Sequence, residues 1–285
     1  MVEILELLLT PLSYGFMQRG LLAALMVGVL CSVIGCYVVL RSMAFLGDAM
    51  AHAVLPGVAV AYLIGRNLTV GALAAALVVA LGVGLFSRRG MIKQDTAIGV
   101  LFAAALSLGV VLISSIRTYA VDLSHILFGN VLGVSDLDLW LTAGLGAVIL
   151  LSILVFYKPF LVISFDPVLA ATLRMRVGLL NNLLLVLLAM TIVISIQTVG
   201  VGLVAAMLVT PAATAFLFVR RLPAMMLLSG LIGGFSSLIG LFASYHLNVV
   251  SGAAIVLTTT IIFLLAFLFA PQRGMIWEYF RRQAI

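Results

Sequence analysis

Charged residues are scarce in this chain of 285 residues. Aspartate, glutamate, lysine and arginine make up 8% of it, whereas 65% of its residues are hydrophobic. A soluble domain of this length does not need so much apolar surface, so the composition excludes a soluble globular protein. Together with the mean hydropathy of +1.36, this indicates an integral membrane protein with several transmembrane helices.

Cysteine is also rare, with Cys31 and Cys36 both inside the first hydrophobic run. Residues five apart on a helix point about 140° away from each other, so we expect neither a shared metal nor a disulfide. Both thiols are instead expected to be small core residues. The net charge of +6 does not indicate nucleic acid as a partner, because the basic residues fall in the predicted loops.

Several nucleotide-binding and catalytic motifs are missing. Neither Lys93 nor Lys158 follows a glycine, so the chain has no G-x-x-x-x-G-K loop for binding ATP phosphates. It also has no G-x-S-x-G and no H-E-x-x-H motif. We therefore expect a protein that is not an enzyme and holds no permanent cofactor.

Long charge-free runs separate the clusters of charged residues. Each run is long enough for one or two membrane spans of roughly 20 residues. We predict an all-α, polytopic membrane protein with about eight or nine transmembrane helices. If residues 1–17 or 123–134 behave differently, the count becomes about eight or ten. Basic residues concentrate in alternate loops, which predicts a cytoplasmic C-terminus and an external N-terminus. The spans are predicted near residues 20–40, 43–65, 67–87, 96–116, 137–157, 178–197, 200–219, 222–245 and 249–271.

The connection at residues 122–133 is apolar but too short to cross a membrane. These properties are typical of an interfacial or re-entrant helix. His125 lies in this segment, and we expect it to be an interfacial histidine rather than a ligand.

A second connection carries the signals of a short cytoplasmic helix. Asp166 is a good N-cap, Pro167 fits the first helical position, and Gly178 can close the far end. This helix is either a connector lying on the membrane or a docking helix for a soluble partner, and the residues alone favour neither. Its apolar face and its charge near the end come from Leu169, Ala170, Ala171, Leu173 and Arg174.

Small and polar residues inside the spans predict close contacts between helices. Gly233 and Ser237 form a small-xxx-small pair, as do Gly230 and Gly234, and such pairs let helix backbones approach closely. Polar residues at the start of a later span, Asn181 and Asn182, are expected to hydrogen-bond between helices.

The second span contains an ionisable pair, Asp48 and His52, which share one helix face one turn apart. A carboxylate with an imidazole suits Mn²⁺, Fe²⁺ or Zn²⁺. Pro56 follows one turn later and cannot donate to the carbonyl of His52, which predicts a kink and a free backbone oxygen. The alternatives are a helix N-cap for Asp48 after Gly47, and a buried His52 bonded to a neighbouring helix. Two ligands do not close a metal site, so other helices or water must supply the rest.

These residues resemble a known family. The segment from Arg41 to Gly57 is similar to the signature of the bacterial ABC-3 permeases, the membrane subunits of manganese, zinc and iron ABC importers. The chain departs from the family near its last span, where Val250 stands in place of a frequent proline. The similarity covers nearly the whole chain and continues through Asp122 to Gly133, Phe165 to Pro167, Val199 to Leu203, Pro211 to Ala215 and Ser251 to Ala253.

The resemblance implies a permease homodimer with two cytoplasmic ATPase subunits and an extracytoplasmic metal-binding lipoprotein that delivers the ion. It also implies that Asp48 and His52 line the ion path and that the helix from Asp166 docks on the ATPase. On this basis we expect a single transmembrane permease domain over residues 1–285 in the bacterial cytoplasmic (inner) membrane. It would import a divalent transition metal, and the lack of a thiolate ligand favours manganese slightly.

Three other functions are open to a chain of this composition. A secondary transporter would move the metal with protons through Asp48 and His52, although no other intramembrane carboxylate supports it. An intramembrane enzyme such as a protease has no serine–histidine motif to support it. A permease for a chelated metal would have no need for paired ionic ligands.

Overall fold

The computed structural model describes residues 10–87, 93–115 and 131–270, and all regular elements within these ranges are helical. In this part of the chain, nine helical segments are long and apolar enough to cross a membrane. The predicted all-α, polytopic fold is therefore confirmed. The spans are α2 (Gly15–Leu40), α3 (Phe45–Ala53) with α4 (Leu55–Leu63), α5 (Leu68–Ser87), α6 (Gln94–Ser114), α8 (Asp136–Val155), α11 (Val177–Val199), α12 (Val201–Phe218), α13 (Leu222–Leu247) and α14 (Ser251–Phe269).

The short elements agree less well with the predictions. The sequence did not predict α9 (Tyr157–Phe165), which follows α8 directly and leads into α10 (Pro167–Thr172). The predicted re-entrant helix, with His125, lies mostly outside the described residues. Its last part is the 3-10 turn η1 (Val131–Gly133).

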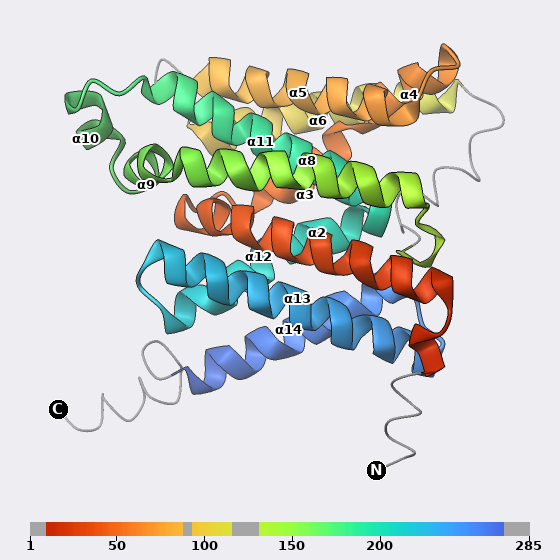
Figure 1. The fold of residues 1–285 in the computed structure, drawn as a ribbon. Coiled ribbons are helices and arrows are strands. Elements are labelled where there is room, and N and C mark those ends of the chain that lie inside the picture. The colour runs from red at the N-terminus through yellow and green to blue at the C-terminus, as the bar shows by residue number, and fades with distance from the viewer. Residues whose placement is uncertain (1–9, 88–92, 116–130, 271–285) are drawn as a thin grey trace.

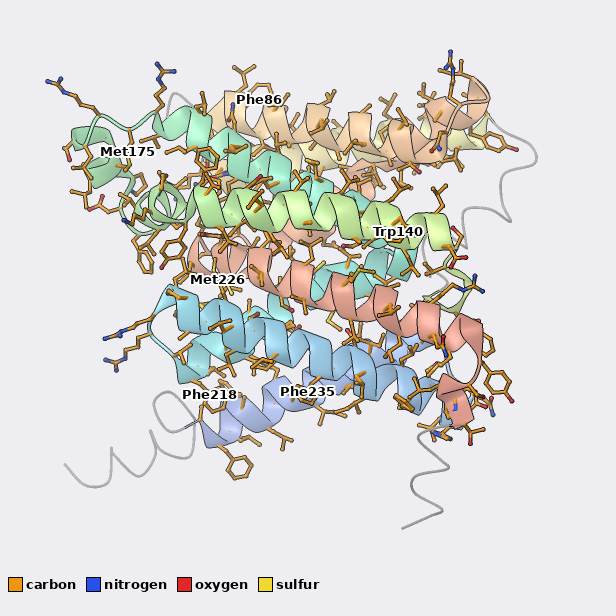
Figure 2. The ribbon with its side chains drawn as sticks, in the orientation of Figure 1. Phe86, Trp140, Met175, Phe218, Met226 and Phe235 are labelled. Carbon is orange, nitrogen blue, oxygen red and sulfur yellow. The ribbon has the colours of Figure 1, made fainter. Side chains whose placement is uncertain are left out.

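The spans lie side by side and roughly parallel (Figure 1). Helices α4, α5 and α6 form one edge of the bundle, α14 forms the opposite edge, and α2 lies between them. Around the outside, large side chains such as Phe86, Trp140 and Phe235 project away from the helices and are exposed (Figure 2). An apolar surface of this kind suits contact with lipid.

The helices α2 and α13 meet at small residues. A Cβ placed on Gly233 would lie 2.6 Å from the carbonyl oxygen of Gly28 in α2, so only glycine permits this approach. The predicted close contact is therefore confirmed for Gly233, whereas Gly230 and Gly234 meet α2 side chains at an ordinary 3.7 Å.

The cysteines lie in the same buried interior. Cys31 contacts the hydroxyl of Ser195 at 3.3 Å, and the Cys36 thiol donates to the carbonyl of Ser32 at 3.4 Å. Both are buried and free, so the prediction of small core residues is confirmed.

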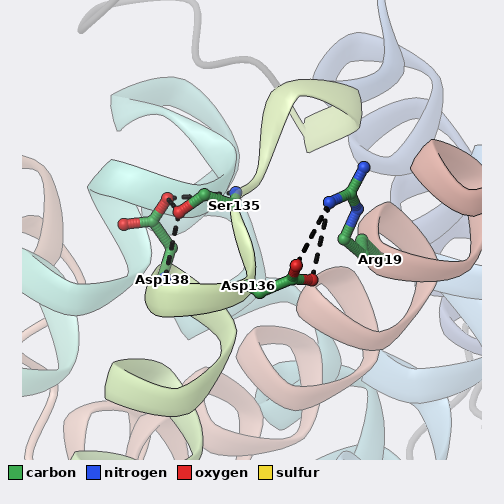
Figure 3. A network of polar contacts seen from close by, with 4 residues as sticks. All are labelled: Arg19, Ser135, Asp136 and Asp138. Atoms are coloured by element: carbon green, nitrogen blue, oxygen red, sulfur yellow. Dashed lines mark hydrogen bonds and ion pairs between the residues drawn. The ribbon is translucent and has the colours of Figure 1, made fainter.

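The bundle has two chemically different ends. We call the end that carries α9 and α10 the inner end, and the opposite end the outer end (Figure 1). The outer end carries the start of α8, where Ser135 and Asp138 form a capping box and Arg19 of α2 pairs with Asp136 (Figure 3). By the positive-inside rule, the excess of basic residues at the inner end predicts that this end faces the cytoplasm. These residues are Arg41, Lys158, Arg174, Arg176, Arg220 and Arg221.

Candidate metal site and coupling helix

The second span is broken where the sequence predicts a kink. Helix α3 ends at Ala53 and α4 begins at Leu55, with Pro56 in the first turn of α4. Pro56 has no N–H to give to the His52 carbonyl, as the sequence predicts, and the Val54 N–H turns back towards that carbonyl.

Asp48 and His52 lie on α3 just before this break. The distance between His52 Nε2 and Asp48 Oδ1 is 3.6 Å, and the two side chains are 29% and 47% exposed for His52 and Asp48, respectively. The N-cap of α3 is Ala44, whose methyl group cannot accept a hydrogen bond, and Asp48 lies inside the first turn. The alternative interpretation of Asp48 as an N-cap is therefore wrong.

The packing of α3 explains why this pair faces outward. Small residues on the other face, including Gly47 and Ala51, are buried, and a Cβ on Gly47 would lie 2.7 Å from the Leu208 side chain of α12. Because α3 is pressed against α12 on that side, its polar face points away from the core. The pair is consequently only half-buried in the single chain.

An aromatic side chain from α6 borders the pair. The Phe102 ring lies 6.2 Å from the His52 ring, centroid to centroid, and contacts Phe45 edge-to-face at 5.7 Å. His52 is thus held beside an apolar ring and is not fully buried, unlike the histidine of the alternative interpretation.

The ligand set is incomplete within one chain. Among the described residues, no group of three or more histidine, cysteine, aspartate or glutamate side chains is close enough to hold a metal ion. A carboxylate oxygen and an imidazole nitrogen offer two donors, whereas closed structural metal sites have about four. Such an open pair suits an ion that passes through rather than one that stays.

The short inner helix α10 has the predicted start but a different end. Asp166 Oδ1 accepts the Val168 and Leu169 N–H groups at 2.9 Å each, and Pro167 is the first helical residue, as predicted. Arg174, at φ +56°, ends the helix in the left-handed conformation, and the Met175 N–H bonds the Ala170 carbonyl at 3.0 Å. The predicted closure by Gly178 is wrong.

Gly178 instead lies in the first turn of α11, because the chain reverses four residues earlier than the glycine rule suggested. The predicted apolar face of α10 is confirmed at Leu169 and Leu173, which are exposed, and Ala171 is exposed beside them. Ala170 is fully buried against its own chain, and Val168 is an exposed apolar residue that the sequence reasoning missed.

Arg41 is a second residue that sequence reasoning used only to orient the chain. It follows the last residue of α2, and its Nη2 donates to Asn181 Oδ1 in α11. The prediction of a hydrogen bond between helices is thus confirmed for Asn181. No local signal in the sequence reveals this contact, because its two residues are 140 positions apart in the chain.

The fold and this site define a polytopic membrane transport protein rather than an enzyme. The model of the ABC 3 transport family matches residues 13–270, and the chain therefore belongs to this family. The resemblance noted in the sequence is confirmed.

Relatives in several bacteria carry transport names. The chain is 48% identical to the manganese transport system membrane protein MntC of Halalkalibacterium halodurans, over 95% of this chain and 92% of that one. It is 44% identical to the manganese import system permease protein ScaB of Streptococcus gordonii, over 92% and 94%. It is 41% identical to a protein of Haemophilus influenzae named as an iron transport system membrane protein, over 93% and 98%.

Solved structures show the same fold. A chain of PsaBC from Streptococcus pneumoniae, in complex with Fab, matches with a TM-score of 0.85 and 41% identity over 98% of this chain and 99% of that one. An inward-facing ABC transporter of metal-chelate type matches with a TM-score of 0.71 over 88% and 85%, but at 16% identity this likeness shows the fold alone.

Family membership confirms the predicted class of function. The chain is a multi-pass membrane permease of a bacterial ABC importer, and ATP hydrolysis belongs to a separate ATPase subunit. The alternatives of a proton-coupled secondary transporter and of an intramembrane enzyme are therefore wrong.

Proposed function

We propose that this permease, a single transmembrane domain, imports Mn²⁺ and that Asp48 and His52 hold the ion during passage. The half-exposed carboxylate–imidazole pair beside the break in the second span carries this proposal. Ionisable groups inside a membrane span are expensive and usually functional. The manganese names of MntC and ScaB support the choice of metal, whereas the iron name of the Haemophilus influenzae relative keeps Fe²⁺ as the competing outcome.

The chemical types of the two ligands support Mn²⁺ as the transported metal. Carboxylate and imidazole ligands suit Mn²⁺, whereas soft thiolates select Cu(I) and favour Zn²⁺. Cys31 and Cys36 are bonded to Ser195 and Ser32 inside the bundle, so neither thiol contributes to the pair. A neutral imidazole and an ionised carboxylate are the forms that ligate.

We propose further that the permease works as a homodimer. One chain offers two donors and leaves both side chains partly exposed, so a second copy facing the first would bring a second pair. Four donors from two copies would leave water to complete the octahedral coordination that Mn²⁺ prefers. The extracytoplasmic metal-binding lipoprotein would deliver the ion at the outer end.

Uptake of radioactive Mn²⁺ tests the ion site. Asp48→Asn keeps the size of the side chain but removes its charge, and His52→Ala removes the imidazole. Both variants should lose at least about tenfold in uptake at matched membrane expression, since each removes half of the donors in one chain. Asp136→Asn is the matched control, because Asp136 is a highly exposed aspartate at the outer end.

Near-native uptake by Asp48→Asn would contradict the ion site at that residue. Competition by unlabelled Zn²⁺ and Fe²⁺ in the same assay identifies the metal. Stronger competition by Fe²⁺ than by unlabelled Mn²⁺ would contradict manganese as the substrate.

We also propose that α10 is the helix on which the ATPase docks. Its exposed apolar residues, Val168, Leu169 and Leu173, form a surface at the inner end that the described residues leave uncovered. Replacing Val168 with Glu should leave the permease folded but reduce uptake and the ATPase stimulated by Mn²⁺. Normal coupling in purified Val168→Glu complexes would show that the ATPase docks elsewhere.

A further inference from the structure

Arg41 is a charged side chain in an unusual setting. It lies at the inner end directly after α2, and its only hydrogen bond within the described residues goes to the neutral amide of Asn181. Its Nη1 is buried without a partner among those residues. Burial lowers the pKa of the guanidinium. A buried charge without an opposite charge is destabilising, so its presence calls for a function beyond packing.

On one side, Arg41 is joined firmly to the helix that bears the ion ligands. Ser42 adopts the left-handed conformation at φ +55°, and the Met43 N–H bonds back to the Val38 carbonyl at 2.9 Å. The Leu46 N–H then bonds to the Met43 carbonyl at 2.9 Å, which leads into α3. This closed corner means that α3 and the end of α2 cannot shift independently, and Asp48 lies in the first turn of α3.

On the other side, Asn181 is joined just as firmly to α10. The corner between α10 and α11 is closed by the bond from the Met175 N–H to the Ala170 carbonyl, at 3.0 Å. Leu180 bonds back to the Arg176 carbonyl at 3.0 Å, and Asn181 follows it in α11. Because this bond closes the tight turn at Arg174, a displacement of α10 would carry the start of α11 with it.

We infer that the hydrogen bond between Arg41 and Asn181 transmits the movement of α10 to α3. The inference rests on the proposed function, in which α10 meets the ATPase and α3 holds the ion. Arg41 and Asn181 are positioning residues, since they touch neither ATP nor the metal. When α10 moves on ATP binding, α11 pulls Arg41 through this bond, and the closed corner at Ser42 passes the displacement to Asp48 and His52.

The length and charge of arginine suit this task. Its guanidinium reaches from the end of one helix to the side of another, and a hydrogen bond from a charged donor is stronger than one between neutral groups. The neutral acceptor keeps the contact weaker than an ion pair, so it can adjust between two states of the transporter. A spatial chain of contacts alone does not establish coupling, which must be measured as a non-additive effect.

A double-mutant cycle in the reconstituted permease–ATPase complex tests the inference. Arg41→Met keeps the aliphatic stem, Asn181→Ala removes the acceptor, and the third variant carries both changes. Each variant is assayed for Mn²⁺ uptake per ATP hydrolysed and, separately, for Mn²⁺ binding. Each single change should lower uptake per ATP about tenfold, the usual range of coupling between sites, while binding of Mn²⁺ stays within about twofold.

The double variant should be no worse than either single variant, because the bond can be lost only once. Arg41→Lys, which keeps a charged donor, should recover part of the coupling. Arg19→Met is the matched control, since Arg19 is an arginine of α2 at the outer end, and it should couple normally.

Independent, multiplying effects of Arg41→Met and Asn181→Ala would overturn the inference. Loss of Mn²⁺ binding in Arg41→Met would overturn it as well, because Arg41 would then act on the ion site itself. If Arg41→Met does not fold, Asn181→Ala alone tests the hydrogen bond, and normal uptake per ATP in this variant refutes its role in coupling. Failure of the proposed function gives a different result, because the wild-type complex would then transport Zn²⁺ or Fe²⁺ instead of Mn²⁺. In that case the double-mutant cycle is measured with the transported ion.

Discussion

The two ends of α2 carry arginines in opposite environments. At the outer end, Arg19 Nη1 lies 3.5 Å from both carboxylate oxygens of Asp136, and the side chains are 41% and 77% exposed (Figure 3). At the inner end, Arg41 is largely buried and bonds a neutral amide. An exposed ion pair contributes little and is replaceable, whereas a buried charge with a neutral partner is costly. The two arginines should therefore differ in how much their removal changes the protein.

Packing separates the two ends in the same way. A Cβ on Gly35, near the inner end of α2, would lie 1.8 Å from the Leu208 carbonyl oxygen of α12. A Cβ on Gly20 would lie 2.9 Å from the Val131 carbonyl oxygen, and a Cβ on Gly15 would have no described atom within 4 Å. The backbone of α2 is therefore tightest towards the inner end.

The largest expected effect follows from this gradient. Gly35→Ala should destabilise the permease by about 3 kcal/mol, since two helix backbones must separate. Gly20→Ala should have a smaller effect, and Gly15→Ala should have almost none. Thermal unfolding of the purified variants in detergent measures the series, and equal midpoints for Gly35→Ala and Gly15→Ala would contradict the gradient.

The next largest effect separates packing from docking on α10. Ala170 is fully buried, whereas its neighbour Ala171 is exposed. Ala170→Leu should lower the stability of the permease by about 2 kcal/mol through overpacking around the buried side of α10. Ala171→Leu is the matched control and should unfold at the wild-type temperature. A stable Ala170→Leu variant would mean that the site around Ala170 can enlarge, and that its burial does not hold α10 in place.

Much of the fold was predictable because it depends on local chemistry. The length of the hydrophobic segments predicts the spans, and Pro56 predicts the break between α3 and α4. Asp166 and Pro167 predict the start of α10. Each of these effects operates within a few neighbouring residues. The pair of Asp48 and His52 was predictable for the same reason, since helix periodicity alone puts both on one face.

The missed features depend on partners far away in the sequence. Helix α9 is fixed by Phe160 and Ile163, which are buried in the core, although its sequence has no capping signal that precedes it. Glycine is the residue usually found in the left-handed conformation at a helix C-terminus, so the sequence pointed to Gly178. In the structure Arg174 adopts this conformation instead. The burial of Ala170 and the bond from Arg41 to Asn181 require the positions of α9 and α11, which no local pattern contains.

A smaller effect is expected when the helix caps at the two ends are removed. Asp166 caps α10 at the inner end, and Ser135 caps α8 at the outer end. Removing either cap with Asp166→Ala or Ser135→Ala should cost about 1 kcal/mol of helix stability. If α10 docks on the ATPase, only Asp166→Ala should also reduce uptake, whereas Asp166→Asn should retain it because asparagine caps equally well. Equal losses of uptake in Asp166→Ala and Ser135→Ala would argue against a special role for α10.

The smallest expected effect is the removal of the outer arginine. Arg19→Ala should lower the stability of the permease by only about 0.5 kcal/mol at low salt, since Arg19 and Asp136 are exposed to solvent. High salt screens such a pair, so the difference from wild type should shrink towards zero as the ionic strength rises. Unfolding midpoints measured at low and at high salt test this, with Arg19→Lys as the charge-conserving control. A large loss that persists at high salt would mean that the outer pair is as deeply involved in the structure as Arg41, and the contrast between the two ends would fail.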